Sequence, residues 1–165
     1  MKRAVIYTDG ASSGNPGPSG IGVAIDFQGH SIHIAEHIGS TTNNVAEYSA
    51  LARGLSEARE LGAEAVDVYM DSELVVKQIK GLYKVKNQGL RPIYESVMKL
   101  LRSFSKYTVS HVPREKNTVA DGLSKIGAKP GAQPVWKSDP PMDSPEGLIR
   151  SDTGSGAGGQ GNLPF

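Results

Sequence analysis

Residues 23–34 read VAIDFQGHSIHI, and this stretch decides which class of fold the chain adopts. Apolar residues alternate with polar or small ones over residues 23–28 and again over residues 32–38, on either side of the turn signal Gln28-Gly29-His30. A period of two places successive side chains on opposite faces of a strand. A short glycine-containing connection between two such runs is typical of a hairpin. The stretch therefore predicts an antiparallel β-hairpin with one face toward water.

The segments on both sides of this hairpin alternate between strand and helix patterns. Residues 3–8 form a short apolar run, typical of a strand that is buried on both faces. Residues 43–62 carry apolar side chains at helical spacing and end at a glycine. Farther along, the patterns predict strands over residues 65–70 and 107–112, and helices over residues 72–80, 93–104 and 118–126, the last capped by Asn117.

This order of elements predicts an α/β fold. An opening hairpin followed by strand–helix–strand units favours a mixed sheet, because helical crossovers join parallel strands. We expect a five-stranded sheet in which strands 1–3 are antiparallel, strands 4 and 5 run parallel to strand 1, and helices flank the sheet.

The composition is that of a globular chain with one core. Of its 165 residues, 38% are hydrophobic and 21% are charged, which is too apolar for a disordered chain and too polar for a membrane protein. The basic start Met1-Lys2-Arg3 is followed by too few apolar residues for an export signal. The absence of cysteine excludes disulfides, thiolate metal sites and cysteine nucleophiles. We therefore expect a monomeric cytoplasmic protein whose metals have oxygen or imidazole ligands.

The last part of the chain differs from the rest in composition. Of the 37 residues in 129–165, 7 are glycine and 6 are proline, a share typical of disordered segments. Its large apolar side chains, including Trp136, Leu148 and Ile149, are too few to form a core. We predict a domain over residues 1–128 and a disordered Gly/Pro-rich tail or linker over residues 129–165.

Four acidic residues stand where the predicted elements would bring them together. Asp9 and Asp71 each follow a strand, so they lie at the carboxyl ends where open α/β sheets bind ligands. Glu47 lies on the apolar stripe of the long helix, and Asp121 lies inside the last helix. Clustered carboxylates repel one another unless cations are bound, and oxygen ligands favour Mg²⁺ or Mn²⁺. Two such ions about 3.5–4 Å apart suit in-line attack on a phosphodiester.

Each of these acids also has an ordinary structural explanation. These alternatives are a turn residue for Asp9, a first-turn helix residue behind a Thr42 or Asn43 cap for Glu47, a helix N-cap for Asp71, and simple solvent exposure for Asp121. The sequence alone leaves them open.

Short blocks around the acids follow one another in a specific order. They are YTDGA at residues 7–11 with GNPGP at 14–18, TNNVAE at 42–47, MDS at 70–72 and NTVAD at 117–121, with 38, 24 and 50 residues between successive acids. Together these blocks resemble type 1 ribonuclease H, across the whole of residues 1–128. The chain is most similar to archaeal-type members and to the amino-terminal domain of actinobacterial two-domain proteins. In the latter case residues 129–165 would link to a second, phosphatase-like domain.

The resemblance implies a substrate, a metal and a set of site residues. The implied activity is cleavage of the RNA strand of RNA–DNA hybrids, leaving 5′-phosphate and 3′-hydroxyl ends. Two Mg²⁺ ions, or Mn²⁺ in their place, would be held by Asp9, Glu47, Asp71 and Asp121. The implied substrate contacts are Gly10, Asn15, Thr42, Asn43 and Asn44. Among them, Asn15 and Thr42 would hold a phosphate of the DNA strand, and Asn43 and Asn44 would approach the minor groove.

Two residues ahead of the last block are candidates to assist turnover. His111 precedes Asp121 by ten residues, the separation of a mobile histidine in many family members, and Arg114 precedes it by seven, as in archaeal-type members. Either could help the product to leave. The alternatives are a strand-end packing histidine and a solvated loop arginine. We expect Arg114 to matter more, because the chain otherwise follows the archaeal-type pattern.

The connection between the two middle helices departs from part of the family. Residues 81–88 are too few for the extra basic helix with which some members grip substrate, and no separate hybrid-binding domain is present. Lys84 and Lys86 in this connection could contact phosphates, together with Lys77, Lys80, Arg91 and Tyr83. These side chains could equally form an ordinary solvated face.

Two other classes of function fit part of the sequence. A single lobe of an actin-like ATPase also has an acid beside a Gly-rich turn, but such proteins need two lobes around a nucleotide and residues 1–128 supply one. A non-catalytic hybrid-binding module would have little reason to retain four acids, which repel phosphate unless a metal is bound. The sequence therefore favours the nuclease, and binding of hybrid without metal would favour the module.

Overall fold

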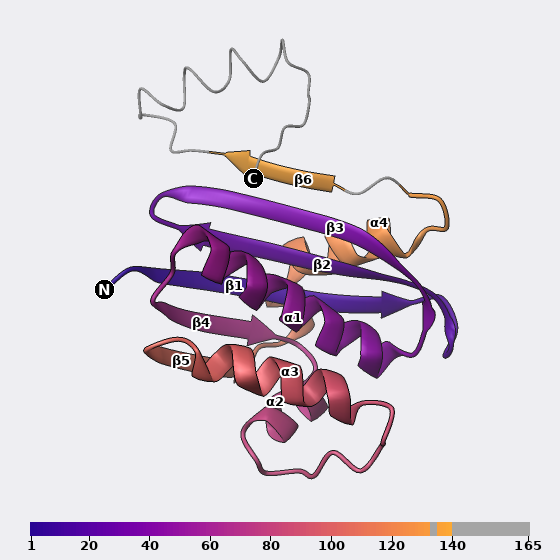
Figure 1. The fold of residues 1–165 in the computed structure, drawn as a ribbon. Coiled ribbons are helices and arrows are strands. Elements are labelled where there is room, and N and C mark those ends of the chain that lie inside the picture. Colours follow the sequence, from indigo (N-terminus) through magenta and orange to yellow (C-terminus); the bar gives the residue numbers. More distant parts are fainter. Residues whose placement is uncertain (133–134, 140–165) are drawn as a thin grey trace.

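The computed structural model describes residues 1–132 and 135–139, and Figure 1 shows its strands side by side in one twisted sheet. The strands are β1 (Arg3–Ser12), β2 (Gly17–Phe27), β3 (His30–Thr41), β4 (Ala65–Met70), β5 (Lys106–His111) and β6 (Val135–Asp139). Their order in the sheet is β5-β4-β1-β2-β3-β6. β1, β2 and β3 pair antiparallel, β4 pairs parallel with β1, and β5 pairs parallel with β4. The predicted arrangement of the first five strands is confirmed.

The β2–β3 hairpin contains the turn that the sequence predicted. Ile25 lies opposite Ile32 in the ladder, and Gln28 and Gly29 connect the strands with positive φ angles of 51° and 81°. Positive φ at both central residues is the signature of a type I′ turn, whose twist matches that of the paired strands. β1 and β2 are longer than their apolar runs indicated, because their ladder continues through small and polar residues.

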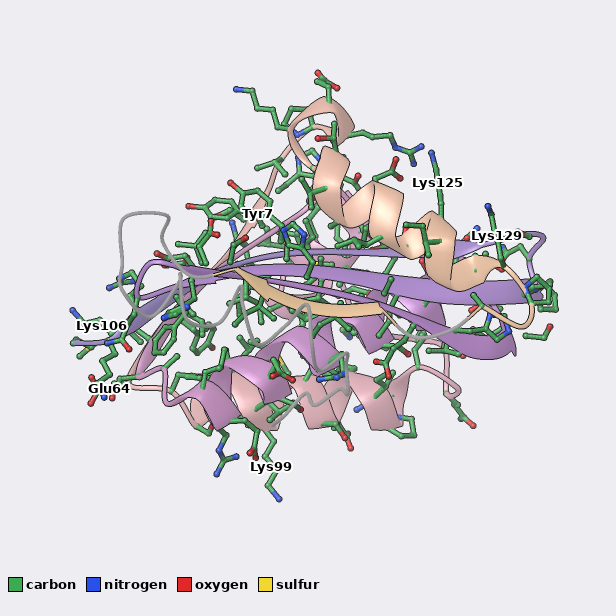
Figure 2. All side chains as sticks on the ribbon, turned by 90° about the horizontal axis from the view of Figure 1, so that it is seen from above. Tyr7, Glu64, Lys99, Lys106, Lys125 and Lys129 are labelled. Atoms are coloured by element: carbon green, nitrogen blue, oxygen red, sulfur yellow. The ribbon has the colours of Figure 1, made fainter. Side chains whose placement is uncertain are left out.

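Helices cover both faces of the sheet. They are α1 (Asn43–Leu61), α2 (Glu73–Ile79), α3 (Arg91–Arg102) and α4 (Thr118–Ala128), with a short 3-10 turn, η1 (Arg114–Lys116), before α4. α1 and α3 lie on one face and α4 lies on the other, so that Lys99 and Lys125 point away from opposite faces in Figure 2. The core lies largely between the sheet and α1, where Ile6, Leu51 and Val68 are fully buried. No helix in the described segments is long and apolar enough for a membrane crossing.

α1 has a clear signal at each end. The Thr42 hydroxyl accepts a hydrogen bond from the Val45 N–H at 3.3 Å, which is the N-cap arrangement. Gly62 ends the helix in the left-handed conformation, with φ of 94°, which glycine adopts without steric cost. Because both signals are local, the sequence predicted the bounds of this helix well.

Two glycines of β2 allow α4 to lie directly against the strand backbone. A Cβ atom at Gly22 would lie 2.5 Å from the backbone nitrogen of Ser124, and one at Gly20 would lie 2.6 Å from its carbonyl oxygen. Such distances are shorter than van der Waals contact, so any larger residue would push α4 away from the sheet. This close approach determines where the side chains of α4 meet β1.

We expect Gly22→Ala to lower the melting temperature and Gly122→Ala to preserve or raise it. The methyl group at Gly22 would meet backbone atoms of α4, and such overpacking costs about 1–3 kcal/mol or more. A Cβ at Gly122 meets no atom of the described residues within 4 Å, so alanine there gains up to about 1 kcal/mol of helix propensity. Thermal unfolding of both variants measures the difference. Equal melting temperatures would contradict the close contact between α4 and β2.

β6 is a difference from the sequence prediction. Residues 129–165 were expected to form an undocked tail, yet Val135–Asp139 pairs antiparallel with β3, from Val135 opposite Ala35 to Asp139 opposite Ser31. β3 would otherwise be an edge strand with unpaired N–H and C=O groups, and any extended segment can satisfy these through its backbone. The composition of a segment indicates whether it can form a hydrophobic core, but it does not show whether its backbone pairs with the edge of a sheet. The other residues to which the prediction of disorder applied, 133–134 and 140–165, lie outside the described part of the chain.

Candidate active site

Three carboxylates from separate elements meet at one edge of the sheet. Asp9 lies on β1, Asp71 directly follows β4, and Glu47 lies on α1. One oxygen from each of these side chains lies within 4.8 Å of the others. The parallel pairing brings Asp9 and Asp71 together, because Thr8 lies opposite Met70 at the carboxyl ends of β1 and β4. The structure thus gathers three of the four acids into one tight group.

The position of Asp9 excludes its interpretation as a turn residue. Asp9 pairs with Gly22 inside the β1–β2 ladder, and only 3% of it is exposed. The next residue, Gly10, passes so close to α1 that a Cβ there would lie 2.5 Å from the backbone nitrogen of Glu47. Gly10 was expected to contact substrate, and the structure gives it a packing role that brings β1 against α1. This contact places Glu47 beside Asp9.

The ordinary explanations of Glu47 and Asp71 also fail. Glu47 is the fifth residue of α1 and lies beyond its first turn. The helix dipole favours an acid within the first turn and therefore does not explain an acid at this position. The N-cap of α2 is Ser72, whose hydroxyl accepts from the Val75 N–H at 3.3 Å, so Asp71 caps nothing. Both carboxylates therefore lie at this edge without a role in forming a helix end.

Asp121 lies in the first turn of α4, beside the tight group but outside it. Its carboxylate contacts Lys125 Nζ at 3.0 Å and forms a hydrogen bond with Asp9 that contributes to the pKa of both groups. Asn117 occupies the predicted N-cap position of α4, but its side chain makes no capping hydrogen bond. Its amide instead donates to the Thr8 carbonyl at 3.0 Å. This bond ties the start of α4 to β1, one residue before Asp9.

Burial and mutual repulsion perturb the protonation of the acids. Burial, then the negative charge of Asp71 and a hydrogen bond with Asp121, raise the pKa of Asp9 from 3.8 to about 7. Burial, and then the charges of Asp9 and Asp71, raise the pKa of Glu47 well above its ordinary value. Burial acts most strongly to raise the pKa of Asp121, but Lys125, Asp9 and Arg114 together hold that pKa below its ordinary value. Without a cation, Asp9 and Glu47 therefore hold their protons to a higher pH than ordinary carboxyl groups do.

The donor set fits a hard divalent cation. Within the described part of the chain, Glu47 Oε1 and Asp71 Oδ2 are buried oxygens with no hydrogen-bond partner. Leaving such atoms unsatisfied is costly, whereas a bound cation would satisfy them. Carboxylate oxygens are the ligands that Mg²⁺ and Mn²⁺ prefer. Asp9, Glu47 and Asp71, with Asp121 beside them, could therefore hold such an ion.

Of the two residues expected to assist turnover, Arg114 reaches the acids. It begins η1, and its Nε lies 3.9 Å from Asp71 Oδ2 while 72% of the side chain is exposed. His111 ends β5 opposite Met70 and is exposed. Lys77 and, to a smaller extent, His111 lower the pKa of Glu73 at the start of α2.

The residues expected at the DNA strand lie on two adjoining segments. Asn15, in the β1–β2 connection, accepts through Oδ1 a hydrogen bond of 2.9 Å from the backbone N–H of Asn43. Thr42 precedes α1, and Asn44 follows Asn43 in its first turn. Asn15 and Thr42 both use a side-chain oxygen as an acceptor here. The Asn15 amide N–H and the Thr42 hydroxyl proton are thus the groups that could donate to a phosphate.

The basic residues of the α2–α3 connection form a separate surface. Lys84 and Lys86 are exposed and line an open groove with Tyr83 and Arg91. Figure 1 shows this connection beyond α2 and α3, at the β4–β5 side of the molecule. Its start is fixed internally, because the Gln78 amide donates to the Lys84 carbonyl at 3.4 Å.

Comparison with known proteins gives relatives over most of the chain. Residues 7–127 match the family described as "Reverse transcriptase-like". The chain is 32% identical to ribonuclease HI of Haemophilus ducreyi over 142 residues, which cover 78% of this chain and 92% of that protein. It is 43% identical to "Bifunctional protein Rv2228c" of Mycobacterium tuberculosis over 134 residues, covering 79% of this chain. The match spans only 37% of the length of that mycobacterial relative.

Solved structures give the same result. RNase H1 from the archaeon Halobacterium salinarum superimposes with a TM-score of 0.71 at 35% identity, covering 76% of this chain and 96% of that one. LC11-RNase H1 in complex with an RNA/DNA hybrid superimposes with a TM-score of 0.68 at 40% identity, covering 74% of this chain and 94% of that one. The similarity therefore extends across the sheet and the helices that carry the four acids.

Proposed function

Because the chain belongs to the type 1 ribonuclease H family, we propose that it is a metal-dependent endonuclease that hydrolyses the RNA strand of RNA–DNA hybrids. The observation that carries the proposal is the convergence of Asp9, Glu47 and Asp71, whose oxygens lie within 4.8 Å of one another. A similar protein, LC11-RNase H1, was solved with an RNA/DNA hybrid. The proposed products carry 5′-phosphate and 3′-hydroxyl ends.

We propose two Mg²⁺ ions as the cofactor, with Mn²⁺ as a substitute, held by Asp9, Glu47, Asp71 and Asp121. Ions bound there would supply an activated water and would neutralise charge at the scissile phosphodiester. The chain's own contribution is a buried set of carboxylates with unsatisfied oxygens. Lys125 also contacts Asp121 and contributes to lowering its pKa against the effect of burial.

Substrate recognition would use the segments on both sides of the acids. The Asn15 amide and the Thr42 hydroxyl would donate to a phosphate of the DNA strand, and Asn43 and Asn44 would approach the minor groove. A hybrid differs from either pure duplex in groove shape and carries 2′-hydroxyls on one strand. Contacts of this kind select a hybrid without reading base sequence. The exposed Lys84 and Lys86 would add phosphate contacts that depend on salt concentration.

Cleavage of defined nucleic acids tests the proposal directly. End-labelled RNA–DNA hybrid, RNA duplex, DNA duplex and single-stranded RNA are incubated with the full chain, with Mg²⁺, Mn²⁺ or EDTA. We expect cleavage of the RNA strand of the hybrid with either metal and none with EDTA. Analysis of the product ends then checks for 5′-phosphate. Binding of hybrid without cleavage in any metal would contradict the proposal and favour the non-catalytic module.

Without metal, the chain is expected to lose stability as the pH rises from about 4 to about 7. Asp9 has a higher pKa in the folded state, about 7 against 3.8, so it binds its proton more tightly when folded. Its stabilising contribution is complete below the lower pKa and is lost as the pH rises through the higher one. Melting temperatures in EDTA across this range measure the effect.

Two further measurements, one with Mg²⁺ and one with a variant, distinguish the contribution of Asp9 from that of the other titrating groups. Excess Mg²⁺ should raise the melting temperature more above pH ~7 than below pH ~5, because the cation binds the deprotonated carboxylates. Asp9→Asn should reduce the pH dependence in EDTA. A variant with the same pH dependence as the parent would show that Asp9 is not the group responsible.

A further inference from the structure

Ser124 is a buried hydroxyl that contacts two of the acids but lies outside the four sequence blocks. It follows Asp121 by three residues on α4, and these two positions lie on the same face of a helix. Ser124 is 0% exposed. Its Oγ lies 3.2 Å from Asp9 Oδ2 and 2.8 Å from the backbone carbonyl oxygen of Asp121. The hydroxyl thus joins α4 to the carboxylate on β1.

We propose that Ser124 is a positioning residue whose hydroxyl fixes the orientation of the Asp9 carboxylate for binding of a divalent cation. The proposal rests on the function proposed above for the identity of the site as a cation site. Its evidence is separate, because it depends on a contact between α4 and β1 that the family blocks do not include.

The hydroxyl has two acceptors and one proton. A bond from a helical serine to a carbonyl oxygen three residues earlier is an ordinary local arrangement and alone would imply no role in the site. The second acceptor is a carboxylate, which when ionised forms the stronger hydrogen bond. A hydroxyl proton shared between the Asp121 carbonyl oxygen and Asp9 Oδ2 accounts for the distances from Ser124 Oγ to both acceptors.

Asp9 needs such a donor because nothing in its own geometry fixes the plane of the carboxylate. The terminal torsion of aspartate is broad, so the plane rotates easily when unsupported. The Ser124 hydroxyl donates to Asp9 Oδ2 at 3.2 Å. It therefore restricts the rotation of the carboxylate, which favours binding of a cation.

Ser124 itself is held in place by β2. Its backbone nitrogen lies 2.5 Å from where a Cβ of Gly22 would be, and its carbonyl oxygen lies 2.6 Å from where a Cβ of Gly20 would be. This part of α4 therefore rests on the strand backbone and cannot move closer to the sheet. Removing the hydroxyl by Ser124→Ala takes away the donor while the helix keeps its contacts with β2.

Mn²⁺ binding to the full chain tests the proposal without relying on cleavage. Free Mn²⁺ is followed by its electron paramagnetic resonance signal during titration of the parent, Ser124→Ala and Ser103→Ala. Ser103 is the matched control, because its hydroxyl also donates to a carbonyl oxygen three residues earlier, that of Leu100 at 2.6 Å, at the end of α3. We expect Ser124→Ala to weaken Mn²⁺ binding about tenfold, the lower range for the loss of a group that orients a metal ligand. Ser103→Ala should bind Mn²⁺ like the parent.

Folding is checked on the same samples by circular dichroism and by the melting temperature in EDTA. Should Ser124→Ala not fold, Ser124→Cys replaces it, since a thiol is a weaker donor of similar shape, and weaker Mn²⁺ binding is again expected. A folded variant at position 124 that binds Mn²⁺ as tightly as the parent would overturn the proposal. Ser124 would then be only a helix residue bonded to the Asp121 carbonyl.

Hybrid cleavage on the same samples separates this proposal from the proposed function. If the parent cleaves no hybrid while Ser124→Ala still weakens Mn²⁺ binding, the positioning role stands and the proposed nuclease activity fails. If the parent cleaves hybrid and Ser124→Ala leaves Mn²⁺ affinity unchanged, the activity stands and the positioning role fails.

Discussion

Asp9→Asn is expected to abolish hybrid cleavage while the metal-free chain keeps or gains thermal stability. Asp9 belongs to the tight group of carboxylates and also interacts with Asp121. Its replacement removes a negatively charged ligand, and residues that act as a unit lose at least about a thousandfold in rate when one member is lost. Asparagine keeps the shape of the side chain but removes a charge that burial and Asp71 oppose. Cleavage rates and melting temperatures in EDTA measure the two effects.

Asp26→Asn is the matched control for this substitution. Asp26 lies on the neighbouring strand β2 and is exposed, so its replacement should change neither the cleavage rate nor the melting temperature appreciably. Cleavage at the parental rate by Asp9→Asn would show that the assignment of the site is wrong. A lower melting temperature in EDTA would contradict the argument that the metal-free acids repel one another.

Arg114→Ala is expected to lower turnover by roughly ten- to a hundredfold, the range for losing one charged catalytic assistant. Arg114 Nε lies 3.9 Å from Asp71 Oδ2, and its exposed side chain is free to turn toward a phosphate. A guanidinium stays charged over the whole working pH range, so it can stabilise a phosphate but cannot act as a base near neutral pH. His111 is exposed at the end of β5, and His111→Ala should change turnover little.

Two further variants show whether position and charge matter. Lys116→Ala removes a cation from the same turn η1 and should leave turnover nearly unchanged. Arg114→Lys keeps the charge but loses the planar guanidinium and should recover part of the rate. Turnover is measured with saturating hybrid and Mg²⁺. A larger loss for His111→Ala than for Arg114→Ala would make the histidine the assisting residue.

Local periodicity predicted most of the fold. The alternation around Gln28 and Gly29 predicted the hairpin, and the cap and the final glycine of α1 predicted its bounds. These signals are local, because each depends on neighbours within one turn or one strand. The undetected strand β6 depends instead on the free edge of β3, which lies about a hundred residues earlier in the chain. Pairing between distant backbones leaves no comparable local signal.

The sequence also predicted that Asp9 and Asp71 would meet, because parallel strands end at the same edge of a sheet, whereas Asp121, expected in the same cluster, lies beside the tight group. The sequence did not predict how closely the elements approach one another. Gly10 and Gly22 allow direct backbone contact with α1 and α4, and a glycine in a strand pattern does not reveal its partner. Asn117 is the N-cap residue of α4 as predicted, but its amide donates to the Thr8 carbonyl across the fold and makes no local capping bond. Only the structure distinguishes a local partner from a distant one.

The direction of β6 determines at which end of the sheet its last residue, Asp139, lies. β6 runs antiparallel to β3, so Asp139 lies opposite Ser31, near the β2–β3 turn. At that end of the sheet, Phe27 of β2 lies opposite Ala4, at the start of β1, whereas Asp9 lies toward its other end. Five residues of extended strand separate Ala4 from Asp9, about 17 Å at 3.3–3.4 Å per residue. A reporter protein joined directly after Asp139 would therefore begin at the end of the sheet remote from the acids.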